Sequence, residues 1–208
     1  MKTVKIILIS LLIVLAFIGC TKKENLKGHS SSDLINLGWS SFRNGNLKNA
    51  EKYFEELTLR EDEFLIGHAG LGWTYLKRQE FLNARNEFNK FILQNTYAAN
   101  DTITRDVRTG QTFVHSALSE HAEVLLVSNG FVASNNTNNN YRFRYDTKID
   151  VIDIRLLRAM SLIAMSNFTD AYTIVRLVEP NFEIIDINSI EGRLLLFNKI
   201  EELLFDRR

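Results

Sequence analysis

The segment LINLGWSSFRNGNLKNAEKYFEEL, residues 34–57, is followed at a distance of 34 positions by HAGLGWTYLKRQEFLNARNEFNKF, residues 68–91. The two segments carry the same small and aromatic residues at equivalent positions: Gly38 and Gly72, Trp39 and Trp73, Ala50 and Ala84, and Phe54 and Phe88. A fixed period of this length is typical of helical repeat architectures. We therefore interpret residues 31–98 as one two-helix unit that occurs twice.

The glycine in the first predicted helix of each copy indicates close packing of two helices. A glycine inside a helix costs roughly 1 kcal/mol relative to alanine, so its presence at Gly38 and again at Gly72 suggests that another element approaches there. Each segment resembles a tetratricopeptide repeat, which implies two antiparallel helices joined by a short turn. The second copy departs from the pattern in this turn, where Gln79 stands in place of Gly45.

Residues 155–180 fit the same pattern more loosely. Ala159 and Ala171 keep the twelve-residue spacing that separates the small residues of the two clear copies. Pro180 follows the second predicted helix, as proline commonly does after a helix end. We therefore predict a third repeat within residues 150–179.

Residues 103–128 allow two interpretations. Gly110 precedes Ala122 by twelve positions, the spacing of the clear copies, which favours another pair of helices. No turn residue interrupts the stretch, however, which favours one long helix. The sequence pattern supports both interpretations equally.

Residues 188–206 predict an amphipathic helix, because leucine and isoleucine recur at helical spacing with glutamates between them. A repeat array needs a terminal element that covers its last apolar face. The predicted fold class is therefore all-α, an α-solenoid of antiparallel helix pairs similar to tetratricopeptide arrays. Its predicted parts are the repeats 31–64 and 65–98, the looser helices 103–128 and 150–179, an insertion at 129–149 and the capping helix 188–206, within a domain over residues 33–208.

The N-terminus predicts export and a lipid anchor. Two lysines precede an apolar run of 13 residues, 6–18, which is too short for a membrane span and typical of a signal peptide. The sequence Phe-Ile-Gly-Cys at residues 17–20 resembles the lipobox of bacterial lipoproteins, which implies cleavage after residue 19 and lipidation of Cys20. The alternative is an uncleaved N-terminal anchor. We expect residues 20–32 to form a flexible tether, and the body to lie in the cell envelope, beside the inner or the outer membrane.

Residues 129–149 interrupt the helical pattern. An asparagine-rich stretch is followed by Tyr-Arg-Phe-Arg-Tyr at residues 141–145. Alternation at period two favours a short strand, and pairing with residues 131–133 would form a small β-hairpin-like insertion. Two roles remain open for this segment. Either its aromatic side chains pack against the helices, or Arg142 and Arg144 are presented to an acidic partner.

The family resemblance also implies a binding groove. In tetratricopeptide arrays the first helices of successive repeats line a concave face. Carried over to this chain, that face comprises Trp39, Phe42, Arg43, Trp73, Leu76 and Lys77. Tryptophan and arginine are enriched among the residues that dominate interface energies, so we expect a protein partner to bind there. The alternative is that the aromatic strand or the C-terminal helix fills the groove and makes both tryptophans core residues.

Composition and the polar residues disfavour other function classes. The 25 basic and 25 acidic residues give no net charge, and basic and aromatic residues are not concentrated as nucleic-acid binding requires. His115 and His121 are six positions apart, unlike a metal pair on one helix face, and we expect neither a metal nor a cofactor. Phosphate-loop and serine-nucleophile motifs are absent. We therefore expect a membrane-anchored interaction scaffold rather than an enzyme. A lipid-anchored binding protein for a small molecule or glycan fragment is the alternative.

Overall fold

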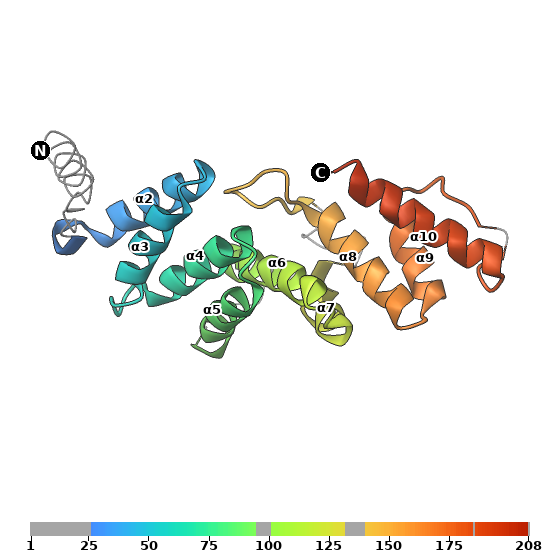
Figure 1. The fold of residues 1–208 in the computed structure, drawn as a ribbon, viewed down its shortest axis with the longest axis horizontal. Coiled ribbons are helices and arrows are strands. Elements are labelled where there is room, and N and C mark those ends of the chain that lie inside the picture. Colours follow the sequence, from blue (N-terminus) through green and yellow to red (C-terminus); the bar gives the residue numbers. More distant parts are fainter. Residues whose placement is uncertain (1–25, 95–100, 132–139, 185, 208) are drawn as a thin grey trace, which may run out of the picture.

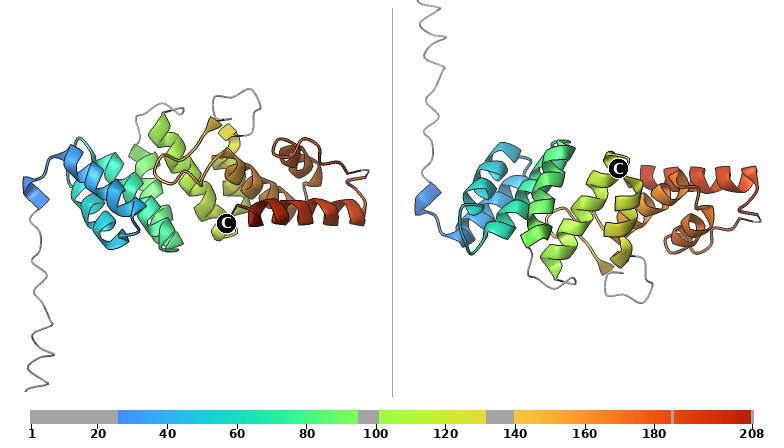
Figure 2. Two further views of the ribbon diagram at one scale, coloured as in Figure 1. Left: turned by 90° about the horizontal axis from the view of Figure 1, so that it is seen from above. Right: turned by 90° about the horizontal axis from the view of Figure 1, so that it is seen from below.

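The computed structural model describes residues 26–94, 101–131, 140–184 and 186–207, and within these ranges the protein is helical, without β-strands. The predicted all-α class is thereby confirmed. The α-helices are α2 (Ser31–Arg43), α3 (Leu47–Leu57), α4 (Phe64–Lys77), α5 (Phe81–Gln94), α6 (Thr102–Ala117), α7 (His121–Val127), α8 (Val151–Ala164), α9 (Phe168–Arg176) and α10 (Ile190–Phe205). They follow one another along an elongated molecule, with α2 and α10 near opposite ends (Figures 1 and 2).

Four helix pairs, α2–α3, α4–α5, α6–α7 and α8–α9, are closed by the same turn. The second residue after each first helix adopts a left-handed backbone conformation, with φ of 74° at Gly45, 61° at Gln79, 57° at Ser119 and 62° at Ser166. The N–H of the residue that follows donates to the carbonyl five positions earlier, at 2.8–2.9 Å in all four turns. This is the hydrogen-bonding pattern of a Schellman cap, which satisfies carbonyls at the end of the first helix. The turn residues recur at intervals of 34, 40 and 47 positions.

Residues 103–128 therefore form two helices and not one long helix. Ser119 supplies the turn between α6 and α7, and the N–H of Glu120 donates to the carbonyl of His115 at 2.8 Å. The interpretation as a helix pair was the correct one of the two. A sequence search for glycine misses this turn, because only one of the four turns has glycine at the left-handed position.

Phe54 of α3 explains two glycines of the first helices. A Cβ atom added to Gly38 would lie 2.6 Å from the Phe54 ring, and one added to Gly70 of the next hairpin would lie 2.3 Å from the same ring. Contacts this short would force the ring to move. Glycine at both positions lets one buried phenylalanine join its own hairpin to the following one.

Phe88 of α5 is enclosed in the same way. A Cβ atom added to Gly72 would lie 2.4 Å from its ring, and one added to Gly110 would lie 2.3 Å from it. Gly110 is therefore the counterpart of Gly70, because each packs on the phenylalanine of the preceding hairpin. Thr112 occupies the position of Gly38 and Gly72, which pack on the phenylalanine of their own hairpin. The alignment of Gly110 from the twelve-residue spacing is thus wrong by two positions.

The core has two parts. A large cluster of buried aliphatic and aromatic side chains extends from α2 to the start of α8. A second cluster joins α8, α9 and α10, where Leu196 and Ile200 are fully buried. The predicted C-terminal helix thus packs on the α8–α9 pair, as expected of a terminal element. Its opposite side leaves Ile190 and Leu194 exposed.

The insertion differs from the predicted hairpin. Among the described residues a single β-bridge joins Arg142 to Asp150. Phe131 belongs to the 3₁₀ helix η2 (Asn129–Phe131) rather than to a strand, and residues 132–133 lie outside the described ranges. The segment therefore pairs with the residues that precede α8, and it extends from there toward α2 (Figure 1).

The start of the described chain is more ordered than a flexible tether through residue 32. Leu26 begins the 3₁₀ helix η1 (Leu26–Gly28) and is buried in the core. Ser30 caps α2 and forms a capping box with Asp33, so the polar serines start a helix. The predicted signal peptide and Cys20 lie outside the described residues. In the part of the chain that is described, no helix is long and apolar enough to cross a membrane.

Candidate functional site

The aromatic segment, residues 141–145, covers the groove that the sequence predicts. The ring of Tyr145 stacks on Trp39 at 3.7 Å with an interplanar angle of 2°, and the ring of Phe143 stacks on Trp73 at 3.9 Å and 16°. Trp39 and Trp73 are consequently only 5% and 2% exposed. We call the surfaces of α2, α4 and α6 that meet this segment the inner face.

The other predicted groove residues divide into buried and exposed groups. Phe42 is buried and meets Phe143 edge to face at 6.3 Å. Leu76 is partly buried, while Arg43 and Lys77 are exposed. The ammonium group of Lys77 lies 4.5 Å from the centre of the Phe42 ring and 3.7 Å from a carboxylate oxygen of Asp146. The structure thus brings the three aromatic residues together beneath the protein's own chain.

The two arginines of the aromatic segment also have partners within the protein. Arg142 lies 3.9 Å from Asp150, and its side chain is 62% exposed. Arg144 lies 3.5 Å from Asp106 of α6, with its side chain about half exposed. The first role considered for the segment, packing of its aromatic rings on the helices, is therefore observed. Presentation of Arg142 and Arg144 to an acidic partner stays a prediction.

Asp106 anchors the aromatic segment to α6. The hydroxyl of Tyr141 donates to this carboxylate at 2.9 Å. Burial raises the pKa of Asp106 to about 6, and it outweighs the opposing effects of the Tyr141 hydrogen bond and the Arg144 charge. The sequence carries no local sign of this contact, because 35 positions separate the two residues.

A cavity of about 400 Å³ remains beside the aromatic segment. Trp39, Trp73 and Tyr145 line its apolar part, and Asp106 and Arg144 contribute charged groups. The indole Nε1 of Trp73 is buried without a hydrogen-bond acceptor among the described residues, which is a costly state for a polar group. An aromatic cavity with few polar groups is of the kind that holds small molecules.

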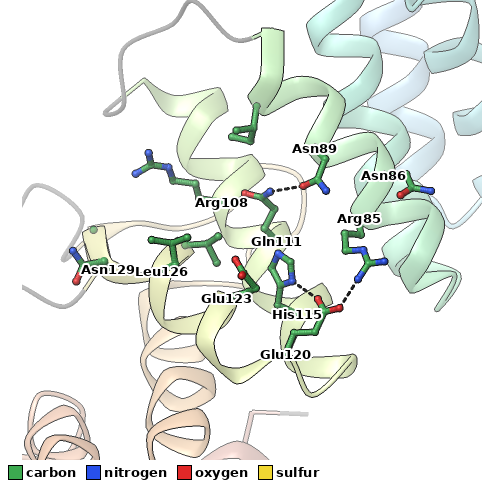
Figure 3. A pocket seen from close by; sticks show the side chains of 13 residues that line it. Arg85, Asn86, Asn89, Arg108, Gln111, His115, Glu120, Glu123, Leu126 and Asn129 are labelled. Atoms are coloured by element: carbon green, nitrogen blue, oxygen red, sulfur yellow. Dashed lines mark hydrogen bonds and ion pairs between the residues drawn. The ribbon is translucent and has the colours of Figure 1, made fainter.

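A larger opening lies between α5, α6 and α7, and we call it the outer cleft. Its volume is about 810 Å³ (Figure 3). Gln111 and His115 of α6 form its base, each 6% exposed. The side of α6 that bears them is turned by roughly 140–180° from Asp106, because successive residues of a helix are about 100° apart. The outer cleft and the inner face therefore use opposite sides of the same helix.

Glu120 of the α6–α7 turn organises one end of the outer cleft. One of its carboxylate oxygens lies 2.6 Å from Nδ1 of His115, and the other pairs with Arg85 of α5 (Figure 3). Nearby, the side-chain amide of Gln111 donates to Asn89 of α5 at 3.2 Å. These contacts fix the α5 wall to the base of the cleft.

Two charged residues of the outer cleft lack partners among the described residues. Arg108 of α6 and Glu123 of α7 make no ion pair or side-chain hydrogen bond within the described ranges. Glu123 lies four residues after the turn residue Ser119, and His115 lies four residues before it, so the two are at the same level of the α6–α7 pair, while Arg108 lies further along α6 (Figure 3). Seven residues of helix separate Arg108 from His115, which corresponds to about 10 Å. The cleft thus presents opposite charges at two separate places.

Sequence reasoning did not find the outer cleft. Its side chains come from α5, α6, α7, the α6–α7 turn and η2, so no local motif marks it. The histidine pair considered in the sequence is divided, since His115 contacts Glu120 while His121 lies 3.4 Å from the Ser161 hydroxyl. No group of three or more potential ligands among the described residues is arranged to hold a metal ion.

The chain was compared with protein-family models, with curated proteins and with solved structures. None of the three comparisons gives a match.

Proposed function

We propose that this protein is a membrane-anchored protein–protein interaction scaffold of the bacterial cell envelope, built as a tetratricopeptide-like α-solenoid and tethered through lipid on Cys20. Four helix pairs closed by the same turn, packed in chain order, support the solenoid. The lipobox resemblance at residues 17–20 supports the tether. Such arrays offer extended surfaces for binding.

We assign the partner to the outer cleft rather than to the inner face. The observation that carries this assignment is the occupation of the inner face by stacked rings of the protein's own chain. The outer cleft, in contrast, is open, and its charged side chains Arg108 and Glu123 have no partners among the residues that the structure describes. Leu126, which is 71% exposed, adds an apolar contact at its edge.

A binding role fits this cleft better than a catalytic one. The carboxylate of Glu120 already contacts both His115 and Arg85. A carboxylate and an imidazole held in this way stabilise each other and the helix pair. The function proposed here is therefore recognition without chemical change of the partner.

The test is affinity purification of the tagged, lipidated full chain from gently solubilised envelope. The cleft variant Arg108→Ala, Leu126→Asp changes one partly buried and one exposed residue. It is compared with the matched variant Arg142→Ala, Leu194→Asp, whose two positions are exposed and lie away from the cleft. Circular dichroism verifies that both variants fold. A partner retained by the matched variant and lost from the cleft variant supports the proposal, and a partner retained by both contradicts the assignment to the cleft.

The 400 Å³ cavity favours a second candidate function, the binding of a small molecule or glycan fragment. Trp39, Trp73 and Tyr145 offer ring faces, and Asp106 and Arg144 offer polar contacts. A ligand there would change the emission of the two tryptophans. Titration of the full chain with envelope-derived glycan fragments should then shift the fluorescence, and Arg144→Ala should weaken that response. An unchanged emission spectrum at saturating ligand would contradict this function.

A further inference from the structure

We propose that the outer cleft binds an extended peptide segment of three or four residues that carries a carboxylate at one end and an amino or guanidino group at the other. This inference rests on the proposed function, since it names the chemistry of the partner at the same cleft. The volume of about 810 Å³ lies within the range of roughly 300–1,000 Å³ that ligand sites occupy.

The distance between two charged residues of the cleft, Arg108 and Glu123, determines the length of the ligand. Arg108 and Glu123 have no partners in the described part of the chain, and seven residues of α6, about 10 Å, separate Arg108 from the level of Glu123. An extended chain advances about 3.3 Å per residue. Two charged side chains three positions apart in an extended peptide span this distance and point to opposite sides of the backbone. The carboxylate is thereby directed to Arg108 on α6 and the basic group to Glu123 on α7.

The walls of the cleft match the peptide backbone between those charges. Asn86 and Asn89 of α5 lie one turn apart, and Gln111 faces them from α6. A side-chain amide offers both donors and an acceptor, as does a peptide group. The Gln111–Asn89 hydrogen bond uses one donor and one acceptor and leaves the remaining groups of both amides for a ligand.

The apolar contacts of the cleft favour a peptide over a sugar. Leu126 and Ile92, 71% and 38% exposed, lie at the cleft and suit a single aliphatic side chain. A sugar ring presents a flat face of C–H groups and packs best on an aromatic ring. The described residues that line this cleft include no phenylalanine, tyrosine or tryptophan.

Calorimetric titration of the full chain in detergent micelles tests the inference with defined tetrapeptides. The probes are acetyl-Asp-Ala-Leu-Lys-amide, the reversed order acetyl-Lys-Ala-Leu-Asp-amide, and the neutral acetyl-Asn-Ala-Leu-Gln-amide. The better of the two charged peptides should bind at least about five-fold more tightly than the neutral one, the ratio that corresponds to ~1 kcal/mol for exposed ion pairs. Arg108→Glu should remove this advantage, and adding Glu123→Arg should restore it for one of the two charged orders.

Arg142→Glu, on the opposite side of the molecule, serves as the matched control and should leave binding unchanged. Equal binding of charged and neutral peptides would overturn the inference, as would an advantage that survives Arg108→Glu. The outcomes also separate the inference from the proposed function. If an envelope partner depends on Arg108 while no peptide binds, only the inference fails. If the peptide binds but no partner co-purifies, only the scaffold function fails.

Discussion

The inner face and the outer cleft lie on opposite sides of α6. They differ in whether their side chains have partners within the described part of the protein. On the inner face the rings are stacked, and Asp106 accepts a hydrogen bond from Tyr141. In the outer cleft Arg108 and Glu123 remain without partners in the described ranges. The comparison teaches that the residue types most typical of an interface, such as tryptophan, here stabilise the fold. The surface to which we assign recognition differs in that two of its charged groups lack partners within the described part of the chain.

The largest expected effect comes from breaking the inner face. Phe143→Ala removes the ring that stacks on Trp73 and should lower the free energy of unfolding by about 3–5 kcal/mol, as expected for a buried phenylalanine. Chemical denaturation measures this loss, and tryptophan emission should move to longer wavelength as water reaches Trp73.

Leu126→Ala in the outer cleft is the matched control for Phe143→Ala. Because Leu126 is 71% exposed, its truncation should change the free energy of unfolding by no more than about 0.5 kcal/mol. Similar losses for the two variants would mean that the two faces do not differ in their contribution to stability.

The pH dependence of stability should report Asp106 specifically. Its pKa is about 6 in the folded protein, against an ordinary value of 3.8, so the folded state holds this proton more tightly than the unfolded state. The stabilising contribution is complete below pH 3.8 and is lost as pH rises through 6. The loss should reach about 3 kcal/mol, from 1.36 kcal/mol per pKa unit. Asp106→Asn should abolish this component in denaturation curves recorded from pH 4 to 7. An unchanged slope in the variant would show that Asp106 is not the group responsible.

A smaller effect on the free energy of unfolding is expected from the turn between α6 and α7. Ser119 joins α6 to α7 with a φ of 57°, a conformation that costs a non-glycine residue roughly 1–2 kcal/mol. Ser119→Gly should therefore raise the free energy of unfolding, by about 1 kcal/mol. Ala117→Gly, at the end of α6, should lower it by a similar amount. If thermal denaturation showed that both variants raise, or that both lower, the free energy of unfolding, the result would argue against the shared turn.

The sequence predicts those parts of the fold in which local pattern and packing agree. The two clear copies, the α8–α9 pair and the C-terminal helix all follow from small and apolar residues at helical spacing. The α6–α7 pair was left open because its turn residue is Ser119. Gly110 was placed in the wrong register because it packs against Phe88 of the preceding hairpin, a contact that spacing within one copy does not contain.

The candidate sites were less accessible from sequence. Of the six predicted groove residues, Trp39, Phe42 and Trp73 lie together against Phe143, and the aromatic segment was recognised as one possible cover for them. Whether the groove is open to a partner or covered by the protein's own chain depends on ring stacking between distant residues. Trp73 and Phe143, for example, are more than 60 positions apart. The outer cleft was missed because its side chains, among them Arg108 and Glu123, come from separate helices and become neighbours only when the hairpins pack.

Photo-crosslinking in the native envelope tests most directly which face binds the partner. Two variants of the tagged, lipidated chain carry p-benzoylphenylalanine at exposed positions, one as Leu126→p-benzoylphenylalanine in the outer cleft and one as Arg142→p-benzoylphenylalanine on the aromatic segment. We predict a crosslinked partner from position 126 and none from position 142. A partner captured from position 142 but not from position 126 would contradict the central claim and return the binding site to the inner face.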